Sequence, residues 1–367
     1  MPDPRYEKWA AALVGFSVVV EPGQTVAISG GVAGEPLLRA IYAEVVKRGG
    51  YPVMLPSFSG LNADLINHGT DEQLAYLSPV ERFVREQADV AVFVIADTNT
   101  KALSGVDPAR QSLWQGARRE LFQTYLRRDA EGSLQWTLTL FPTDAAAQDA
   151  EMSTADFEEF VQHGCKLHTP DPVAAWHELA TEQQRLIDWL IGKSEIHLTG
   201  PDTDLTLSAA GRKWINADGR KNFPDGEVFT GPVEDSVNGH VRFTYPAITG
   251  GREVEDIRLR FENGKVVEAS AAKNEAFLIK QLDTDPGARM LGEFAFGSNF
   301  DITRFTKNIL FDEKIGGTVH MAVGAAYPET GSGNQSAVHW DMICDLRQGG
   351  AVDVDGQPFI RDGKFVV

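Results

Sequence analysis

The first half of the sequence alternates short β-prone runs with helical segments, and this alternation limits the possible folds more than any other feature. Residues 25–29 and 51–55 are β-prone, and apolar residues recur at helical spacing between them, over residues 36–47. Residues 89–96 form an apolar run with the character of a buried strand. Strands joined by helices in this way are parallel, with helices covering the sheet. We therefore predict an α/β N-terminal domain with a mostly parallel sheet.

The pattern changes near residue 195, where short alternating runs replace the strand and helix alternation. Residues 257–261 and 266–267 are two such runs, and the Asn263-Gly264 pair between them is typical of a tight β-hairpin. A helical segment follows at residues 272–281. This pattern predicts an α+β C-terminal domain whose sheet is mostly antiparallel.

The length of the chain favours two domains. Its 367 residues exceed the ~250–300 residues at which one hydrophobic core stops growing. We place the boundary after residue 193, so that residues 1–193 form the N-terminal domain and residues 194–367 the C-terminal domain. A long amphipathic helix expected at residues 174–190 would close the first of these.

Composition and charge argue against several classes of partner. The net charge of −18 and the absence of clustered Lys and Arg argue against nucleic acid. The apolar run at residues 10–20 is too short to span a bilayer and leads into turn-forming residues, so we interpret it as a helix followed by a strand. Only two cysteines occur, Cys165 and Cys344, which favours a reducing cytoplasm over a disulfide-bonded secreted fold.

Several familiar catalytic motifs are absent. Residues 29–34 (SGGVAG) lie between a strand and a helix, where a phosphate loop can sit, but they match neither the P-loop nor G-x-G-x-x-G. We interpret these glycines as the requirement of a tight turn. The sequence also contains no G-x-S-x-G nucleophile elbow and no H-E-x-x-H helix.

The C-terminal half contains residues that could bind a metal ion. His339 and Asp341 are two residues apart in an apolar run, so in a strand both side chains point to the same face. An imidazole beside a carboxylate suits a borderline divalent ion such as Zn²⁺. Upstream, Glu293 stands among apolar neighbours, where a charge is costly unless it is paired or coordinated.

Three further residues extend this set. Glu227 begins a β-prone run, His320 lies in the apolar stretch 318–323, and Tyr327 follows seven residues later. Each also has a structural interpretation, since Glu227 could cap a turn and His320 could be a hydrogen-bonded core histidine. Asp341 could likewise pair with Arg347. Composition and spacing alone leave a metal site and these structural roles both open.

Four stretches of the C-terminal half follow one another in a recognisable order. They are GEVFTGPVEDSVNG (226–239), GARMLGEFAF (287–296), NILFDEKIGGTVHMAVGAAYP (308–328) and QSAVHWDM (335–342). In this order they resemble the M29 family, the thermophilic-type metalloaminopeptidases. The similarity extends to EPGQTVAI in the N-terminal half and so covers nearly the whole chain.

The resemblance implies a function and a set of site residues. Members of the family bind two divalent ions, usually zinc or cobalt, release N-terminal amino acids from peptides, and form homodimers whose active sites face an enclosed cavity. Tyr327 matches a tyrosine beside the metals that is assigned to ligation or catalysis. The positions that match the family's metal ligands are Glu227, Glu293, His320, His339 and Asp341.

We expect two ions to activate a water molecule and to stabilise the tetrahedral oxyanion. In this hypothesis Glu293 bridges the ions or handles the proton, Asp341 is the competing bridge, and the phenol of Tyr327 donates to the oxyanion.

Two alternatives remain open at this stage. A mononuclear iron ring-cleaving dioxygenase on the same fold would use His320, His339 and Asp341 as a facial triad. A non-catalytic acidic binding protein would hold a structural ion. The presence of both Glu227 and Glu293 favours the two-metal peptidase, because a triad needs only one carboxylate.

Overall fold

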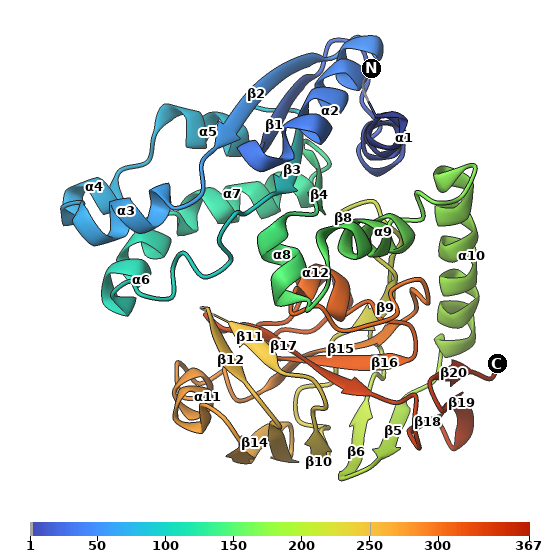
Figure 1. The fold of residues 1–367 in the computed structure, drawn as a ribbon. Helices are drawn as coiled ribbons and strands as arrows, with labels where there is room; N and C mark the ends of the chain where they lie inside the picture. Colours follow the sequence, from blue (N-terminus) through green and yellow to red (C-terminus); the bar gives the residue numbers. More distant parts are fainter. Residues whose placement is uncertain (1–2, 250) are drawn as a thin grey trace. The chain divides into compact units, whose positions relative to one another are not determined.

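The computed structural model describes residues 3–249 and 251–367, which divide into two compact units (Figure 1). The first unit comprises Met1–Val173 and Gly219–Pro224, and the second comprises Ala174–Asp218 and Asp225–Val367. The boundary expected after residue 193 separates domains that fold independently, which is a different property from compactness. That boundary therefore stays a prediction.

The first unit contains a five-stranded parallel sheet in the order β2-β1-β3-β4-β8, which confirms the predicted α/β fold. The apolar run predicted as a buried strand is β3, between β1 and β4. The strands are β1 (Thr25–Gly31), β2 (Tyr51–Ser57), β3 (Val90–Ile95), β4 (Gln135–Leu140) and β8 (Asn222–Phe223).

Helices connect the strands of this sheet (Figure 1). They are α1 (Pro4–Ala12), α2 (Glu35–Lys47), α3 (Leu61–His68), α4 (Asp71–Ala75), α5 (Pro79–Glu86), α6 (Pro108–Ala117), α7 (Arg119–Ala130), α8 (Asp144–Asp149) and α9 (Thr154–Gly164).

The apolar run at residues 10–20 differs from its interpretation in one respect. It continues α1 through a π-helical turn, Leu13–Ser17, and the next strand begins only at Thr25, so the strand expected within the run was wrong. Its side chains pack in the interior instead, as Leu13 and Val14 are fully buried. Among the described residues, no helix combines the length and apolar character needed to cross a bilayer.

The glycines at residues 29–34 allow close packing between β1 and β3. A Cβ at Gly31 would lie 2.5 Å from the carbonyl oxygen of Ala96, and one at Gly30 would lie 2.9 Å from that of Val94. These distances are below any real contact, so the backbone segments approach as closely as glycine permits. Close packing of strands therefore accounts for Gly30 and Gly31, which lie within β1, whereas the sequence indicated a tight turn here.

The second unit contains two large antiparallel sheets, as predicted for the C-terminal part. The eight-stranded sheet, called sheet B here, has the order β14-β13-β10-β6-β5-β18-β19-β20. Its strands are β5 (Glu195–Gly200), β6 (Thr203–Ser208), β10 (Asn238–Arg242), β13 (Arg258–Glu262), β14 (Lys265–Ser270), β18 (Ala351–Val354), β19 (Gln357–Arg361) and β20 (Lys364–Phe365).

The five-stranded sheet, called sheet C, has the order β17-β16-β15-β9-β7. Its strands are β7 (Ile215–Ala217), β9 (Glu227–Thr230), β15 (Leu291–Gly297), β16 (Thr318–Gly324) and β17 (His339–Asp345). The unit also contains a hairpin and four helical segments: β11 (Ala247–Thr249), β12 (Arg252–Val254), α10 (Pro172–Leu190), α11 (Glu275–Leu282), α12 (Ile309–Asp312) and a 3₁₀ turn, η3 (Pro328–Thr330).

Sheets B and C share one apolar core. Leu259 and Phe261 contribute to it from sheet B, and Phe296, Met321 and Trp340 contribute from sheet C. Because side chains alternate along a strand, every second residue of sheet C points away from this core. That outer face carries the candidate site.

Candidate metal centre

The outer face of sheet C gathers the residues that the sequence singled out. On β16, Val319 and Met321 belong to the core, and His320 between them points to the opposite face. On β17, Trp340 belongs to the core, which leaves His339 and Asp341 on the outer face, as their spacing predicts. The strand period therefore brings these three side chains to one surface.

Glu293 reaches the same face because β15 contains a bulge. The pairing of β15 with β16 shifts between Leu291 and Glu293, so the two residues point to opposite faces although they are two apart. Leu291 enters the core and Glu293 the site. The bulged residue is Gly292, where a Cβ would lie 2.4 Å from the carbonyl oxygen of Gly324. Only glycine allows the two strands to approach so closely here.

The carboxylates and imidazoles form three overlapping groups, two of which share Glu293. Glu227, Glu293 and His320 offer donor atoms within 4.8 Å of one another, and so do Glu293, His339 and Asp341. Glu293 Oε1 lies 3.6 Å from His320 Nε2, and Glu293 Oε2 lies 3.3 Å from His339 Nε2. The two oxygens of Glu293 therefore face different histidines.

In each of these two groups a second carboxylate, that of Glu227 or Asp341, also lies beside the histidine. Glu227 Oε2 lies 3.1 Å from His320 Nε2, and Asp341 Oδ2 lies 3.6 Å from His339 Nε2. His339 Nδ1 is 2.8 Å from the carbonyl oxygen of Ala325, which fixes the ring so that Nε2 faces the carboxylates. The buried amide of Gln183 donates to the backbone carbonyl of Glu227 and holds the start of β9.

Tyr327 lies beside this set, at the start of η3. Its ring contacts that of His339, with 5.0 Å between centroids, and that of Phe229, at 5.5 Å. Although 43% of Tyr327 is exposed, desolvation of the phenol and the nearby carboxylates of Glu293 and Asp341 raise its pKa well above its usual value. The phenol therefore keeps its proton and can act as a hydrogen-bond donor.

Three charged residues at the site were missed from the sequence: Asp225, Glu313 and Lys314. Lys314 is fully buried, and its ammonium group contacts the carboxylates of Glu227, Glu313 and Asp225. Glu313 forms a further three-donor group with His320 and Asp341. The run Asp-Glu-Lys resembles a solvated surface segment, and only its apolar flanks, Leu-Phe before it and Ile after it, indicated burial.

The buried charges shift one another's pKa values. Burial alone would lower the pKa of both histidines, but the carboxylates of Glu227 and Glu293 hold the pKa of His320 well above its ordinary value. Asp341 and Glu293 likewise raise the pKa of His339 to about 10. In turn, hydrogen bonds from the two imidazoles outweigh burial and lower the pKa of Glu293 to about 2. Without a bound cation, the protonated histidines balance these carboxylates.

The donor set fits divalent metal ions. Among the described residues, Glu227 Oε2, His320 Nδ1 and Asp341 Oδ1 are buried polar atoms without a hydrogen-bond partner. Buried polar atoms are normally satisfied, so unpartnered ligand atoms in a cluster of carboxylates and imidazoles fit the binding of a cation. Carboxylate oxygen and imidazole nitrogen are the ligands that zinc, cobalt and similar ions take in proteins.

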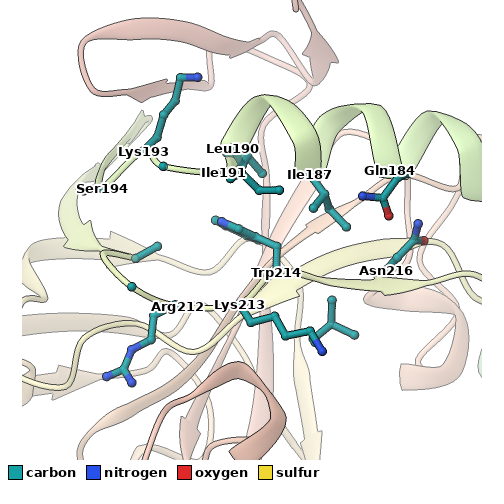
Figure 2. Close-up of a pocket in the computed structure, with 14 residues that line it drawn as sticks. Gln184, Ile187, Leu190, Ile191, Lys193, Ser194, Arg212, Lys213, Trp214 and Asn216 are labelled. Carbon is teal, nitrogen blue, oxygen red and sulfur yellow. The ribbon is translucent and has the colours of Figure 1, made fainter.

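A separate cavity in the same unit contains none of these residues. Its volume is about 690 Å³, and Figure 2 shows Trp214 facing Ile187 and Leu190 of α10 across it. The indole of Trp214 stacks on Phe296 at 5.6 Å, so the floor of the cavity is continuous with the core between sheets B and C. The metal centre is therefore distinct from this apolar cavity.

Comparison with known proteins relates the whole chain to one family. A family model described as thermophilic metalloprotease (M29) matches residues 3–365. The chain is similar to Aminopeptidase T of Thermus aquaticus, with 32% identity over 316 residues that cover 76% of each protein.

Two solved structures share the fold. Wild-type AmpT from Thermus thermophilus matches with a TM-score of 0.87 and 28% identity, over 99% of both chains. The 2,5-dihydroxypyridine dioxygenase of Pseudomonas putida KT2440 matches with a TM-score of 0.61 and 15% identity, over 99% of this chain and 97% of that one. The second likeness concerns the fold alone.

Proposed function

The chain belongs to the thermophilic metalloprotease family M29 and is a metalloaminopeptidase, and from this premise we propose that it releases N-terminal residues from peptides with two divalent metal ions. In this proposal Glu227, Glu293 and His320 hold one ion, and Glu293, His339 and Asp341 hold the other. Membership of an enzyme family sets aside a purely structural ion in a non-catalytic binding protein.

The observation that carries the two-metal proposal is the orientation of Glu293. Its two oxygens face His320 and His339 at 3.6 and 3.3 Å, which is the arrangement a bridging carboxylate requires. Asp341, the competing bridge, lies 3.6 Å from His339 Nε2 and also belongs to a group with Glu313 and His320, whose ligand atoms lie within 4.8 Å of one another. The closer contacts of Glu293 to both histidines favour Glu293 as the bridge.

The charge of the site supports the same number of ions. The buried carboxylates of Asp225, Glu227, Glu293, Glu313 and Asp341 face one buried ammonium group, that of Lys314. With all five carboxylates ionised and both histidines neutral, the forms that bound cations would favour, the site carries four negative charges, which two divalent cations would neutralise. Buried charge that is not compensated is costly, so a single divalent ion would leave the site unbalanced.

When bound, the two ions would lower the pKa of a water molecule, stabilise the developing oxyanion and accept the α-amine of the peptide. Tyr327 keeps its phenolic proton and would donate it as a hydrogen bond to the oxyanion. A bridging Glu293 has no free oxygen for a proton. Glu313, which shares a three-residue group with His320 and Asp341, is then the carboxyl group best placed to accept the proton of the water.

A mononuclear iron triad is less well supported. Each three-donor group in the described part of the chain contains one histidine, whereas a facial triad of His320, His339 and Asp341 needs both around one ion. The likeness to a dioxygenase structure at 15% identity concerns the fold and adds no support for that chemistry. We therefore favour the peptidase.

Three finer properties complete the proposal. Zinc or cobalt suits the mixture of imidazole and carboxylate ligands. Cys165 and Cys344 are both buried and are not joined in a disulfide, which is in keeping with a reducing cytoplasm. The resemblance to M29 enzymes also leads us to expect a homodimer, which sedimentation of the full chain would test.

Elemental analysis combined with hydrolysis of a leucine chromogenic substrate tests the function. We expect two zinc or cobalt ions per chain, loss of hydrolysis on chelation, and recovery when zinc or cobalt is returned. One iron per chain with oxygen uptake on a dihydroxypyridine would overturn the proposal in favour of the dioxygenase.

A further inference from the structure

Lys314 is a buried cation whose ammonium group lies within 4 Å of three carboxylates. The side chain is 1% exposed. Its Nζ lies 2.6 Å from Glu227 Oε1, 2.6 Å from Glu313 Oε1 and 3.5 Å from Asp225 Oδ1. An ammonium group has three donors and no acceptor, so three carboxylates around it suit its charge and its geometry. These contacts direct the ammonium group of Lys314 toward the carboxylates of the site.

The two carboxylate oxygens of Glu227 have different neighbours. Oε1 is held by Lys314, whereas Oε2 lies 3.1 Å from His320 Nε2 and has no hydrogen-bond partner. A carboxylate bound in this way presents one defined oxygen to a metal ion and cannot easily rotate to present both. Glu313 gives one oxygen to the same ammonium and lies in the group with His320 and Asp341.

The backbone around Lys314 is fixed to the strand that carries Glu227. The carbonyl oxygen of Lys314 accepts a hydrogen bond from Asn299 N at 3.1 Å, and the side-chain amide of Asn299 donates to the carbonyl oxygen of Asp225 at 2.8 Å. Gly226 packs against Asn299 so closely that a Cβ would lie 2.6 Å from that of Asn299. The ammonium group is thus held at a set distance from Glu227.

We propose that Lys314 is a positioning residue of the metal centre, which holds one oxygen of Glu227 and one of Glu313 so that the other oxygen of each faces the metal ions. This inference rests on the proposed two-metal function. It adds a residue that acts through the carboxylates without touching metal or substrate.

Lys314→Met tests the inference, because it keeps the length of the side chain and removes its donors. Titrating the metal-free full chain with Co²⁺ against a chelator should show one of the two ions bound ~10–100-fold more weakly, as for the loss of other groups that orient a ligand. The Co²⁺ absorption spectrum should change, and at saturating metal kcat should fall while KM stays the same. Lys273→Met is the matched control, since Lys273 also contacts two carboxylates but at an exposed position.

If Lys314 acted only through its positive charge, Lys314→Met should bind Co²⁺ more tightly than wild type, because removal of a nearby positive charge strengthens the binding of a cation. Co²⁺ binding that is tighter than wild type, or unchanged, would overturn the inference. The double variant Lys314→Met, Asp225→Asn separates the two effects, because it restores the charge balance without restoring the contact to Glu227. It should recover folding stability but not metal affinity, and recovery of both would also overturn the inference.

A crystal structure of the zinc-loaded wild-type chain gives a test that does not depend on a variant that folds. We expect Glu227 to bind zinc through one oxygen while the other stays within hydrogen-bond distance of Lys314 Nζ. Binding through both oxygens would contradict the inference. If the wild-type chain did not bind two ions, the proposed two-metal function itself would be wrong. If only the Lys314 variant bound metal more weakly, the result would bear on the role of Lys314 alone.

Discussion

Substitution of Glu293 by Gln is the most direct perturbation of the metal centre. The two side chains have nearly the same shape, and Glu293 is 4% exposed, so packing should be preserved. Glutamine offers one carbonyl oxygen and one NH₂ group, and the NH₂ group cannot ligate a metal ion. Whichever way the amide is turned, one of the groups around His320 and His339 falls from three donors to two.

The loss should therefore fall on one ion. Removing a group that only orients a ligand costs 10–100-fold in affinity, so removing a charged ligand should cost at least ~100-fold, or about 2.7 kcal/mol. The proposed reaction needs one ion to activate the water molecule and both ions to stabilise the developing negative charge. We therefore expect kcat to fall by at least ~100-fold at stoichiometric metal.

Isothermal titration of metal-free protein with Zn²⁺, together with a leucine chromogenic substrate, would measure both effects. Wild type should bind two ions tightly, and Glu293→Gln should bind one tightly and one weakly. Glu268→Gln, at an exposed glutamate of sheet B, is the control and should match wild type. Two tight ions with full turnover in Glu293→Gln would refute the bridging role.

Three further predictions concern the surroundings of the site. Tyr327→Phe should lower kcat by about 10²–10³-fold with the metal stoichiometry unchanged, since it removes only the donor to the oxyanion; loss of an ion in this variant would point to ligation instead. Gly292→Ala should destabilise the fold by roughly 1–3 kcal/mol in urea unfolding and weaken metal binding, because its Cβ would meet Gly324 O and displace the bulge that orients Glu293; wild-type values for both would contradict this account. Burial raises the pKa of Asp312 to about 7, so the folded state loses stability as the pH rises from about 4 to 7. Asp312→Asn, which still accepts from Thr306, should therefore be more stable than wild type by roughly 2–4 kcal/mol at pH 8 but not at pH 4, and an equal effect at both pH values in urea unfolding would refute the shift.

Much of the architecture followed from periodicity. The alternation of strand and helix in the first half predicted the parallel sheet, and the shorter alternating runs after residue 195 predicted the antiparallel sheets. The spacing of His339 and Asp341 was also sufficient, because two residues along a regular strand return to the same face. The strand expected within residues 10–20 was wrong, because Val14, Val18 and Val20 are buried by packing at the end of a helix rather than by strand pairing.

What the sequence determined by itself was the list of chemically suitable residues on strands and the resemblance that ordered them. Only the tertiary structure decided how they meet. Strand alternation would have put Glu293 on the same face as Leu291, and the bulge at Gly292, which depends on the approach of β16, turned it into the site. Likewise, Lys314 has the sequence context of a surface lysine, and its role arises because Asp225 and Glu227, from a distant segment, join the neighbouring Glu313 around it. Local sequence sets which way a strand residue points, whereas contacts between distant strands set which charges share a buried space.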